Sequence, residues 1–201
     1  MAFVLNQGYL PAVLNCPPMT DDAFARLCAS HPDLHFEVSS EGELIVMPPT
    51  FSLPGLRNAE LGAQLRNWAL VDARGVVSDS STGFVLPNGA RRSPDAAWTL
   101  KSRIRQLPPE QFEGFWHLCP DFVIELRSPS DRPRALRLKM DEWIENGASL
   151  AWLLEPAERR VTVYRPDRAW EVLEAPETLR GEGPVEGFEL QLARVWDPLA
   201  D

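Results

Sequence analysis

The chain has 201 residues and a mass of 22.6 kDa, and 44% of its residues are hydrophobic and 24% charged. These values are ordinary for a globular domain and exclude collagen-like, coiled-coil and wholly disordered chains. The formal net charge of −9 argues against a protein that binds nucleic acid over its whole surface. No apolar run is long enough to span a membrane, and no lysine or arginine precedes Asp21, so we expect a cytoplasmic protein.

Charge is unevenly distributed along the chain. Residues 91–139 contain 10 of the 20 basic residues and 6 of the 29 acidic residues, a local balance of +4 that leaves −13 for the rest. Such a segment is a candidate face for a polyanion, although a surface of salt bridges is an equally good interpretation.

The N-terminal half predicts alternating helices and strands, with turns at its prolines and glycines. In chain order we expect a helix over 20–29, a hairpin of strands over 34–38 and 43–47, a long helix over 56–73 with Gly75 as its C-cap, one or two strands over 76–85, a turn at 87–89, and a returning strand over 92–100 that Pro94 interrupts. Leu61, Leu65 and Trp68 recur at helical spacing and give the long helix its buried face.

The C-terminal half predicts a parallel crossover. We expect a short helix over 110–116, a strand over 122–127, an amphipathic helix over 134–146, a buried strand over 150–154, strands over 160–165 and 169–174, and one more strand within 188–196. A strand, a helix and a second strand in this order place the two strands parallel and side by side. The natural architecture is a mixed α/β (α+β) fold in which helices flank the sheet.

Two charged residues lie in the first strand of this crossover. Side chains alternate between the faces of a strand, so Phe122, Ile124 and Leu126 share an apolar core face. We therefore expect Glu125 and Arg127 to point together out of the core. A carboxylate in a buried strand is costly unless it is paired or binds a metal, so an ion pair and a metal site are both open.

Asp95 and Lys139 complete a constellation around Glu125. Asp95 follows Pro94 in an otherwise apolar strand, and two carboxylates on such strands can converge on a hard cation such as Mg²⁺ or Mn²⁺. Lys139 borders the inward stripe of its helix and could reach the Glu125 face, where its charge would stabilise a reacting phosphate. A lysine that extends to solvent is the competing interpretation.

Four segments form a joint pattern: Arg-Ser-Pro-Asp-Ala-Ala-Trp (92–98), Pro-Asp-Phe-Val-Ile-Glu-Leu-Arg-Ser-Pro-Ser-Asp (120–131), Lys-Met…Trp-Ile-Glu-Asn-Gly (139–147) and Leu-Ala-Trp-Leu-Leu-Glu-Pro (150–156). This pattern resembles the Uma-two family of bacterial restriction endonucleases, which belongs to the PD-(D/E)xK nuclease superfamily. The resemblance covers nearly the whole chain. It implies one domain over 1–201, with an N-terminal helix and hairpin extension (1–50) and a nuclease core of restriction-endonuclease-like fold (51–201).

The resemblance also implies roles for individual residues. Asp95 matches the motif aspartate and Glu125 the second acidic position, so both are expected to hold Mg²⁺ or Mn²⁺. Arg127 stands where the superfamily usually has lysine, and Lys139 matches a lysine that this family tends to carry on the following helix. Glu60, the only acidic residue within 56–69, is the candidate for the acid that the superfamily often adds from its first core helix.

The implied activity is metal-dependent hydrolysis of phosphodiester bonds in nucleic acid, with DNA as the expected substrate. The cation would polarise the scissile phosphate and activate water, while Lys139 and Arg127 would stabilise the developing charge. Five arginines could guide the nucleic-acid backbone to this site: Arg91, Arg92, Arg132, Arg134 and Arg137. Nucleases that cut duplex DNA usually dimerise, so a homodimer or a larger even-numbered homo-oligomer is expected.

Two other functions remain open. One is a catalytically inactive nuclease-fold protein that binds DNA or a protein partner, which the net charge and Arg127 favour. The other is an assembly module with tryptophan-rich surfaces, although four tryptophans occupy positions typical of a core: Trp68, Trp98, Trp143 and Trp152.

Histidine and cysteine show no metal-ligand or disulfide pattern. The three histidines, His31, His35 and His117, are too scattered for a zinc hydrolase. The three cysteines, Cys16, Cys28 and Cys119, are expected to be small buried thiols. No glycine-rich phosphate loop is present, which argues against a nucleoside triphosphatase.

Overall fold

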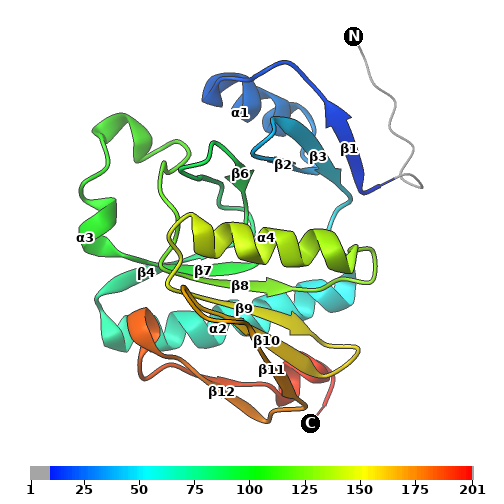
Figure 1. The fold of residues 1–201 in the computed structure, drawn as a ribbon, viewed down its shortest axis with the longest axis vertical. Coiled ribbons are helices and arrows are strands. Elements are labelled where there is room, and N and C mark those ends of the chain that lie inside the picture. The colour runs from blue at the N-terminus through cyan, green and yellow to red at the C-terminus, as the bar shows by residue number, and fades with distance from the viewer. Residues whose placement is uncertain (1–9, 201) are drawn as a thin grey trace.

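The computed structural model of the chain describes residues 10–200. Its two larger sheets lie one above the other in Figure 1, the N-terminal sheet at the top and the central sheet below it. In the described part of the chain, no helix is long and apolar enough to cross a membrane.

The N-terminal sheet contains the predicted hairpin. Across the sheet its strands are β1 (Ala12–Asn15), β3 (Glu43–Met47), β2 (His35–Val38), β6 (Arg91–Arg92) and β5 (Phe84–Val85). Helix α1 (Asp21–Ser30) begins where it was predicted, because the Thr20 hydroxyl accepts a hydrogen bond from the Ala23 N–H at 3.2 Å. The short strand β1 was not predicted.

The central sheet contains the predicted crossover. Across the sheet its strands are β11 (Glu171–Glu174), β10 (Arg160–Tyr164), β9 (Leu150–Glu155), β8 (Phe122–Leu126), β7 (Ala96–Leu100) and β4 (Gly75–Asp79). Strands β8 and β9 are parallel and α4 (Pro133–Glu145) connects them, whereas the other pairs are antiparallel. The crossover and the mixed sheet flanked by helices are therefore confirmed.

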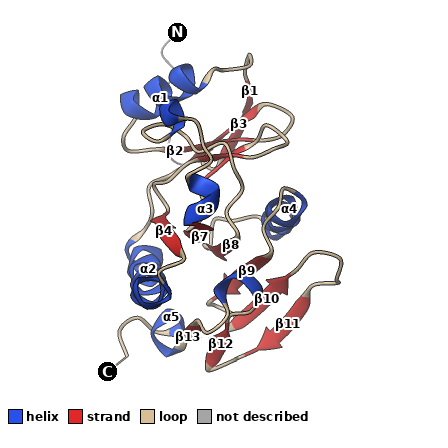
Figure 2. Cartoon of the chain, turned by 90° about the vertical axis from the view of Figure 1, so that its left-hand side faces the viewer, coloured by secondary structure: helices blue, strands red, loops and turns tan. Residues whose placement is uncertain are grey.

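Helices cover both faces of the central sheet. In Figure 2, α2 (Ser52–Asp72) and α4 lie on opposite sides of it. Leu61 and Leu65 of α2 pack on one face against Trp98 and Trp152, while Trp143 of α4 packs on the other. The face that carries Glu125 is thus a second core, so the expectation that Glu125 points out of the core is wrong.

The predicted strand over 92–100 is two strands in different sheets. Strand β6 pairs with β2 and β5 in the N-terminal sheet, whereas β7 pairs with β4 and β8 in the central sheet. The chain passes between the sheets at Pro94, which has no N–H for a sheet ladder. Asp95 consequently lies at the junction of the two sheets.

Gly75 does not cap the long helix. The left-handed residue after α2 is Ala73 (φ 59°), whose N–H donates to the Ala69 carbonyl. Gly75 instead begins β4, where a Cβ atom would lie 2.1 Å from Cε2 of Trp98. A glycine is required there because the Trp98 ring lies directly against its backbone.

The remaining differences concern short elements. The predicted helix over 110–116 is only a 3₁₀ turn at Pro109–Gln111, and the unpredicted α3 (Lys101–Ile104) follows β7 directly. The C-terminal segment forms a two-stranded sheet of β12 (Thr178–Arg180) and β13 (Glu189–Gln191), followed by α5 (Ala193–Trp196). Of the three cysteines, Cys119 is buried as expected and Cys16 and Cys28 are half-buried.

Candidate active site

Asp95 is fixed by hydrogen bonds to both of its carboxylate oxygens. Oδ2 accepts the backbone N–H of Leu126 at 2.7 Å, and Oδ1 accepts Nδ2 of Asn58 at 2.8 Å. The first bond ties Asp95 to the end of β8, and the second ties it to α2. Burial raises the pKa of Asp95 above its ordinary value, against the effect of these donors and of Lys139.

Glu125 lies opposite this position on β8 and is 4% exposed. Its Oε1 accepts hydrogen bonds from Nζ of Lys139 at 2.8 Å and from Nε1 of Trp143 at 2.9 Å, both from α4. Burial raises the pKa of Glu125 to about 7; Lys139 opposes this shift, and the nearby charge of Asp95 adds to it. A further positive charge nearby would stabilise the ionised form of the Glu125 carboxyl group.

Lys139 points into the site, so the alternative of a lysine that extends to solvent is wrong. Its ammonium group has three N–H donors, which face Oε1 of Glu125 at 2.8 Å, Oε1 of Glu37 at 2.9 Å and the Ser93 carbonyl at 3.4 Å. Burial by itself would lower the pKa of Lys139, but the two carboxylates raise it above its ordinary value. Lys139 is therefore a fixed positive charge.

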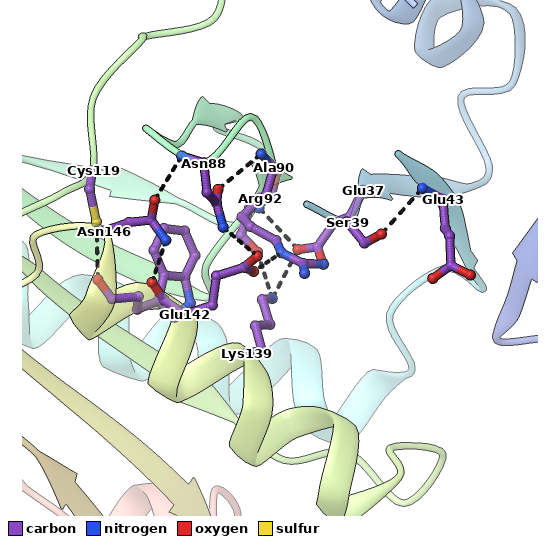
Figure 3. Close-up of polar contacts among 12 residues, drawn as sticks. Glu37, Ser39, Glu43, Asn88, Ala90, Arg92, Cys119, Lys139, Glu142 and Asn146 are labelled. Carbon is purple, nitrogen blue, oxygen red and sulfur yellow. Dashed lines mark hydrogen bonds and ion pairs between the residues drawn. The ribbon is translucent and has the colours of Figure 1, made fainter. Parts of the chain in front are cut away.

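Glu37 of β2 is a site residue that the sequence analysis missed. It is 3% exposed, and its Oε2 accepts Nη1 of Arg92 at 3.1 Å (Figure 3). Burial by itself would raise the pKa of Glu37, but Lys139 and Arg92 lower it. A lone carboxylate in a short strand between Phe36 and Val38 was the available signal.

The charges of this network do not balance. Arg92 also donates from Nε to Glu142 of α4 at 2.5 Å, so the ion pairs join three carboxylates (Glu37, Glu125 and Glu142) to two cations (Lys139 and Arg92). Asp95 is a fourth carboxylate, close enough to Lys139 for the lysine charge to affect its pKa. With all groups ionised, four negative and two positive charges leave an excess of two negative charges. A divalent cation would neutralise that excess.

The donor atoms at the junction suit a hard cation. Asp95 and Glu125 offer carboxylate oxygens, and Oδ1 of Asn58 is buried without a hydrogen-bond partner within the described residues. Across residues 10–200, no three histidine, cysteine or acidic side chains are grouped as metal ligands. Mg²⁺ accepts such a sparse set, because water and phosphate oxygens complete its coordination. The residues present therefore fit Mg²⁺ or Mn²⁺ held by Asp95 and Glu125.

Arg127 does not join this network. It lies on the same face of the strand segment as Glu125, but its Nη1 pairs with Glu155 at 2.9 Å and with Glu158 at 3.0 Å. The expectation that Arg127 and Glu125 act side by side is wrong, because β8 ends at Leu126 and Arg127 turns to the end of β9.

Glu60 is likewise placed away from Asp95. Its Oε1 accepts Nε2 of Gln64 at 2.8 Å, and it lines a shallow surface hollow with Leu56 and Arg194. Asn58 reaches Asp95 instead, because residues two apart on an α-helix differ by about 200° around its axis. The first core helix thus contributes an amide where an acid was expected.

The five arginines divide into two groups. Arg91 pairs with Asp21 at 2.7 Å and Arg92 is buried in the network, so neither is free to guide a nucleic-acid backbone as expected. The others are exposed at the start and on the outer surface of α4: Arg132, Arg134 and Arg137.

Comparison with known proteins identifies the family of this chain. The family Uma2, described as "Putative restriction endonuclease", matches residues 21–193. The chain belongs to the Uma2 family. The match includes the whole central sheet, the N-terminal sheet apart from β1, and the residues Glu37, Asp95, Glu125 and Lys139. The resemblance of the sequence to this family is therefore confirmed.

A solved structure shares the Uma2 fold described above. It is a protein from Anabaena variabilis ATCC 29413, described as a "putative nuclease belonging to DUF820", with 22% sequence identity and a TM-score of 0.72. The alignment covers 89% of this chain and 98% of that one. At this identity the likeness establishes a common fold. A search among curated proteins found no match.

Proposed function

We propose that this Uma2 protein is an endonuclease that hydrolyses phosphodiester bonds of DNA and depends on Mg²⁺ or Mn²⁺. The observation that carries the proposal is the proximity of two carboxylates, the buried Glu125 and the half-buried Asp95, to Lys139 at one sheet junction that has an excess of negative charge. A buried carboxylate whose pKa is raised as far as that of Glu125 is typical of functional sites.

The residues of the site have distinct parts in this proposal. Asp95 and Glu125 hold the cation, which when bound supplies positive charge to a scissile phosphate. The Leu126 N–H and Asn58 orient Asp95, while Trp143 orients Glu125. These hydrogen bonds fix the ligand oxygens in advance, which lowers the cost of binding a cation.

Lys139 supplies the fixed positive charge for the developing negative charge on phosphate. Its contact with the Ser93 carbonyl is the longest of its three, at 3.4 Å, and is the one most readily exchanged for a phosphate oxygen. We assign Arg127 and Glu60 no part in the reaction, since their side chains are held elsewhere.

The exposed arginines of α4 suit the approach of a polyanion. Arg132, Arg134 and Arg137 lie on the helix that also carries Lys139, and each would contact backbone phosphates without reading sequence. The cleavage of both strands of a duplex needs two sites, so we propose a homodimer or a larger even-numbered homo-oligomer that acts in the cytoplasm. Light scattering on the purified protein tests the oligomeric state.

A cleavage screen tests the proposed activity. Duplex DNA, single-stranded DNA and RNA are incubated with the protein and Mg²⁺ or Mn²⁺, beside the Glu125→Gln variant and an Arg127→Met control. We expect DNA cleavage by the parent and the control and none by Glu125→Gln. Equal cleavage by Glu125→Gln and the parent would refute the assignment.

A second candidate is a nuclease-fold protein that binds DNA or a protein partner without cutting. Two observations favour it: the three donors of Lys139 all face oxygens of the protein, and residues 10–200 hold no group of three ionisable metal ligands. Calorimetric titration with Mn²⁺ separates the two candidates. The enzyme requires a site that Asp95→Asn destroys, whereas DNA binding without any Mn²⁺ site supports the second candidate.

A further inference from the structure

The N-terminal sheet contributes one side chain, Glu37, to the network around Lys139. We propose that Glu37 is a positioning residue of this site, which holds Lys139 in place and shares the lysine charge with Glu125. This inference rests on the proposed function and extends it to a residue outside the expected nuclease core.

A single oxygen of Glu37 links two parts of the site. Oε1 lies 2.9 Å from Nζ of Lys139 and accepts the backbone N–H of Ser93 at 3.0 Å. Ser93 stands two residues before Asp95, at the point where the chain passes between the sheets. A displacement of Glu37 would therefore move both the lysine and the segment that carries Asp95.

The other oxygen of Glu37 is fixed from the opposite side. It accepts Nη1 of Arg92, whose Nε is in turn held by Glu142 of α4. Arg92 and Glu37 are both buried, so this pair is poorly screened by solvent and its geometry is rigid. Figure 3 shows the side chains of Glu37, Arg92 and Lys139 gathered at one point, with Lys139 rising from α4 and Glu37 reaching in from the N-terminal sheet.

The position of Lys139 between two carboxylates affects how Glu125 can bind a cation. The distances from Nζ to Glu37 and to Glu125 are nearly equal, 2.9 Å and 2.8 Å. Without the charge of Glu37, Lys139 would pair with Glu125 alone. A divalent cation would then have to compete with an undivided ion pair for the Glu125 carboxylate.

A purely structural part for Glu37, as a link between the two sheets, is the competing explanation. The two explanations differ in their dependence on Lys139. If Glu37 acts through the lysine, its removal changes cation binding only while Lys139 is present. If it merely joins the sheets, its removal has the same effect with or without Lys139.

A double-mutant cycle on the full chain makes this distinction, with calorimetric titration of Mn²⁺ as the readout. The four proteins are the parent, Glu37→Gln, Lys139→Met and the double variant. We expect Glu37→Gln to weaken Mn²⁺ binding by about 10- to 100-fold in the parent background, as losses of outer-shell partners do. In the Lys139→Met background we expect Glu37→Gln to change Mn²⁺ binding by less than about twofold, because Glu37 acts through the lysine. If the two residues acted independently, Glu37→Gln would weaken Mn²⁺ binding by the same factor in both backgrounds.

Two further variants serve as a control and as a substitute in this cycle. Glu43→Gln makes the same charge change in the neighbouring strand β3, where the Glu43 side chain is half-buried, and should leave Mn²⁺ binding unchanged. Glu37→Asp keeps the charge but shortens the side chain, so it takes the place of Glu37→Gln in the cycle if that variant does not fold. In the DNA cleavage assay, Glu37→Gln should lower kcat and leave KM unchanged.

The outcomes separate this inference from the proposed function. If the parent binds Mn²⁺ and Glu37→Gln binds it equally well, or loses the same factor in both backgrounds, the positioning role is overturned and the proposed function stands. If the parent binds no Mn²⁺, the proposed function falls, and the positioning role falls with it.

Discussion

Two clusters of charged side chains lie at the end of β8, one around Glu125 and one around Arg127, two residues later. They differ in burial and in the balance of their charges. The inner cluster surrounds the buried Glu125 and joins three carboxylates to two cations, with Asp95 as a further carboxylate nearby. The outer cluster joins Arg127 and Arg160 to Glu155 and Glu158, so its charges are equal in number. The Arg127 side chain is 24% exposed, whereas that of Glu125 is 5% exposed.

The difference shows which cluster can be functional. The outer cluster neutralises itself and is partly solvated, so it needs no ligand and adds little stability. The inner cluster has taken carboxylates out of water without a full set of cations, which costs stability unless a ligand supplies the missing charge. An uncompensated buried charge, more than the number of charged residues, marks the candidate site.

The largest expected effect separates the clusters by cation binding. Asp95→Asn and Glu125→Gln each remove the charge of one proposed metal ligand. Loss of an outer-shell partner weakens metal binding by up to about 100-fold, so loss of a ligand charge should weaken Mn²⁺ binding by at least about 100-fold. Arg127→Met should leave Mn²⁺ binding unchanged. Calorimetric titration measures all three. A large loss in Arg127→Met would mean that the outer cluster belongs to the site.

The second effect concerns stability. Lys139→Met leaves Glu37 and Glu125 buried without their shared cation and should lower the free energy of unfolding by about 3 kcal/mol. Arg127→Met leaves Glu155 paired with Arg160 and leaves Glu158 exposed to solvent, so it should lower the free energy of unfolding by less than about 1 kcal/mol. Urea unfolding followed by tryptophan fluorescence measures both. Equal losses would contradict the difference in burial.

The third effect concerns pH. The raised pKa of Glu125, about 7, means that below this pH a cation must displace a proton from the carboxyl group. The Mn²⁺ dissociation constant should therefore fall by about tenfold for each pH unit from pH 5.5 towards 7 and level off above it. Calorimetry at several pH values measures the profile. A flat profile over this range would exclude Glu125 as a ligand.

The smallest effect concerns salt. Interactions of the outer cluster are partly screened, so the loss of stability in Arg127→Met should shrink further at an ionic strength of about 1 M. The loss in Lys139→Met should stay nearly constant, because its partners are buried. Urea unfolding at low and high salt provides the measurement, and a similar salt dependence of both variants would mean that the inner cluster is solvated.

Local patterns were sufficient for much of this fold. The N-cap at Thr20, the hairpin of β2 and β3, and the helical spacing of Leu61 and Leu65 were read from neighbouring residues. The crossover of β8, α4 and β9 followed from handedness and from its buried strand pattern. Short elements such as β1 and α3 were missed, because four residues are too few to show a period.

The sequence by itself determined that Asp95, Glu125 and Lys139 lie on elements that can face one another, since alternation and helical spacing set their faces. Only the tertiary structure decided the partners: Glu37 for Lys139, Asn58 rather than Glu60 for Asp95, and Glu155 for Arg127. The physical reason is the range of the forces involved. Periodicity acts between near neighbours in the chain, whereas a buried charge takes whichever partner the packing of two sheets and two helices brings within about 3 Å.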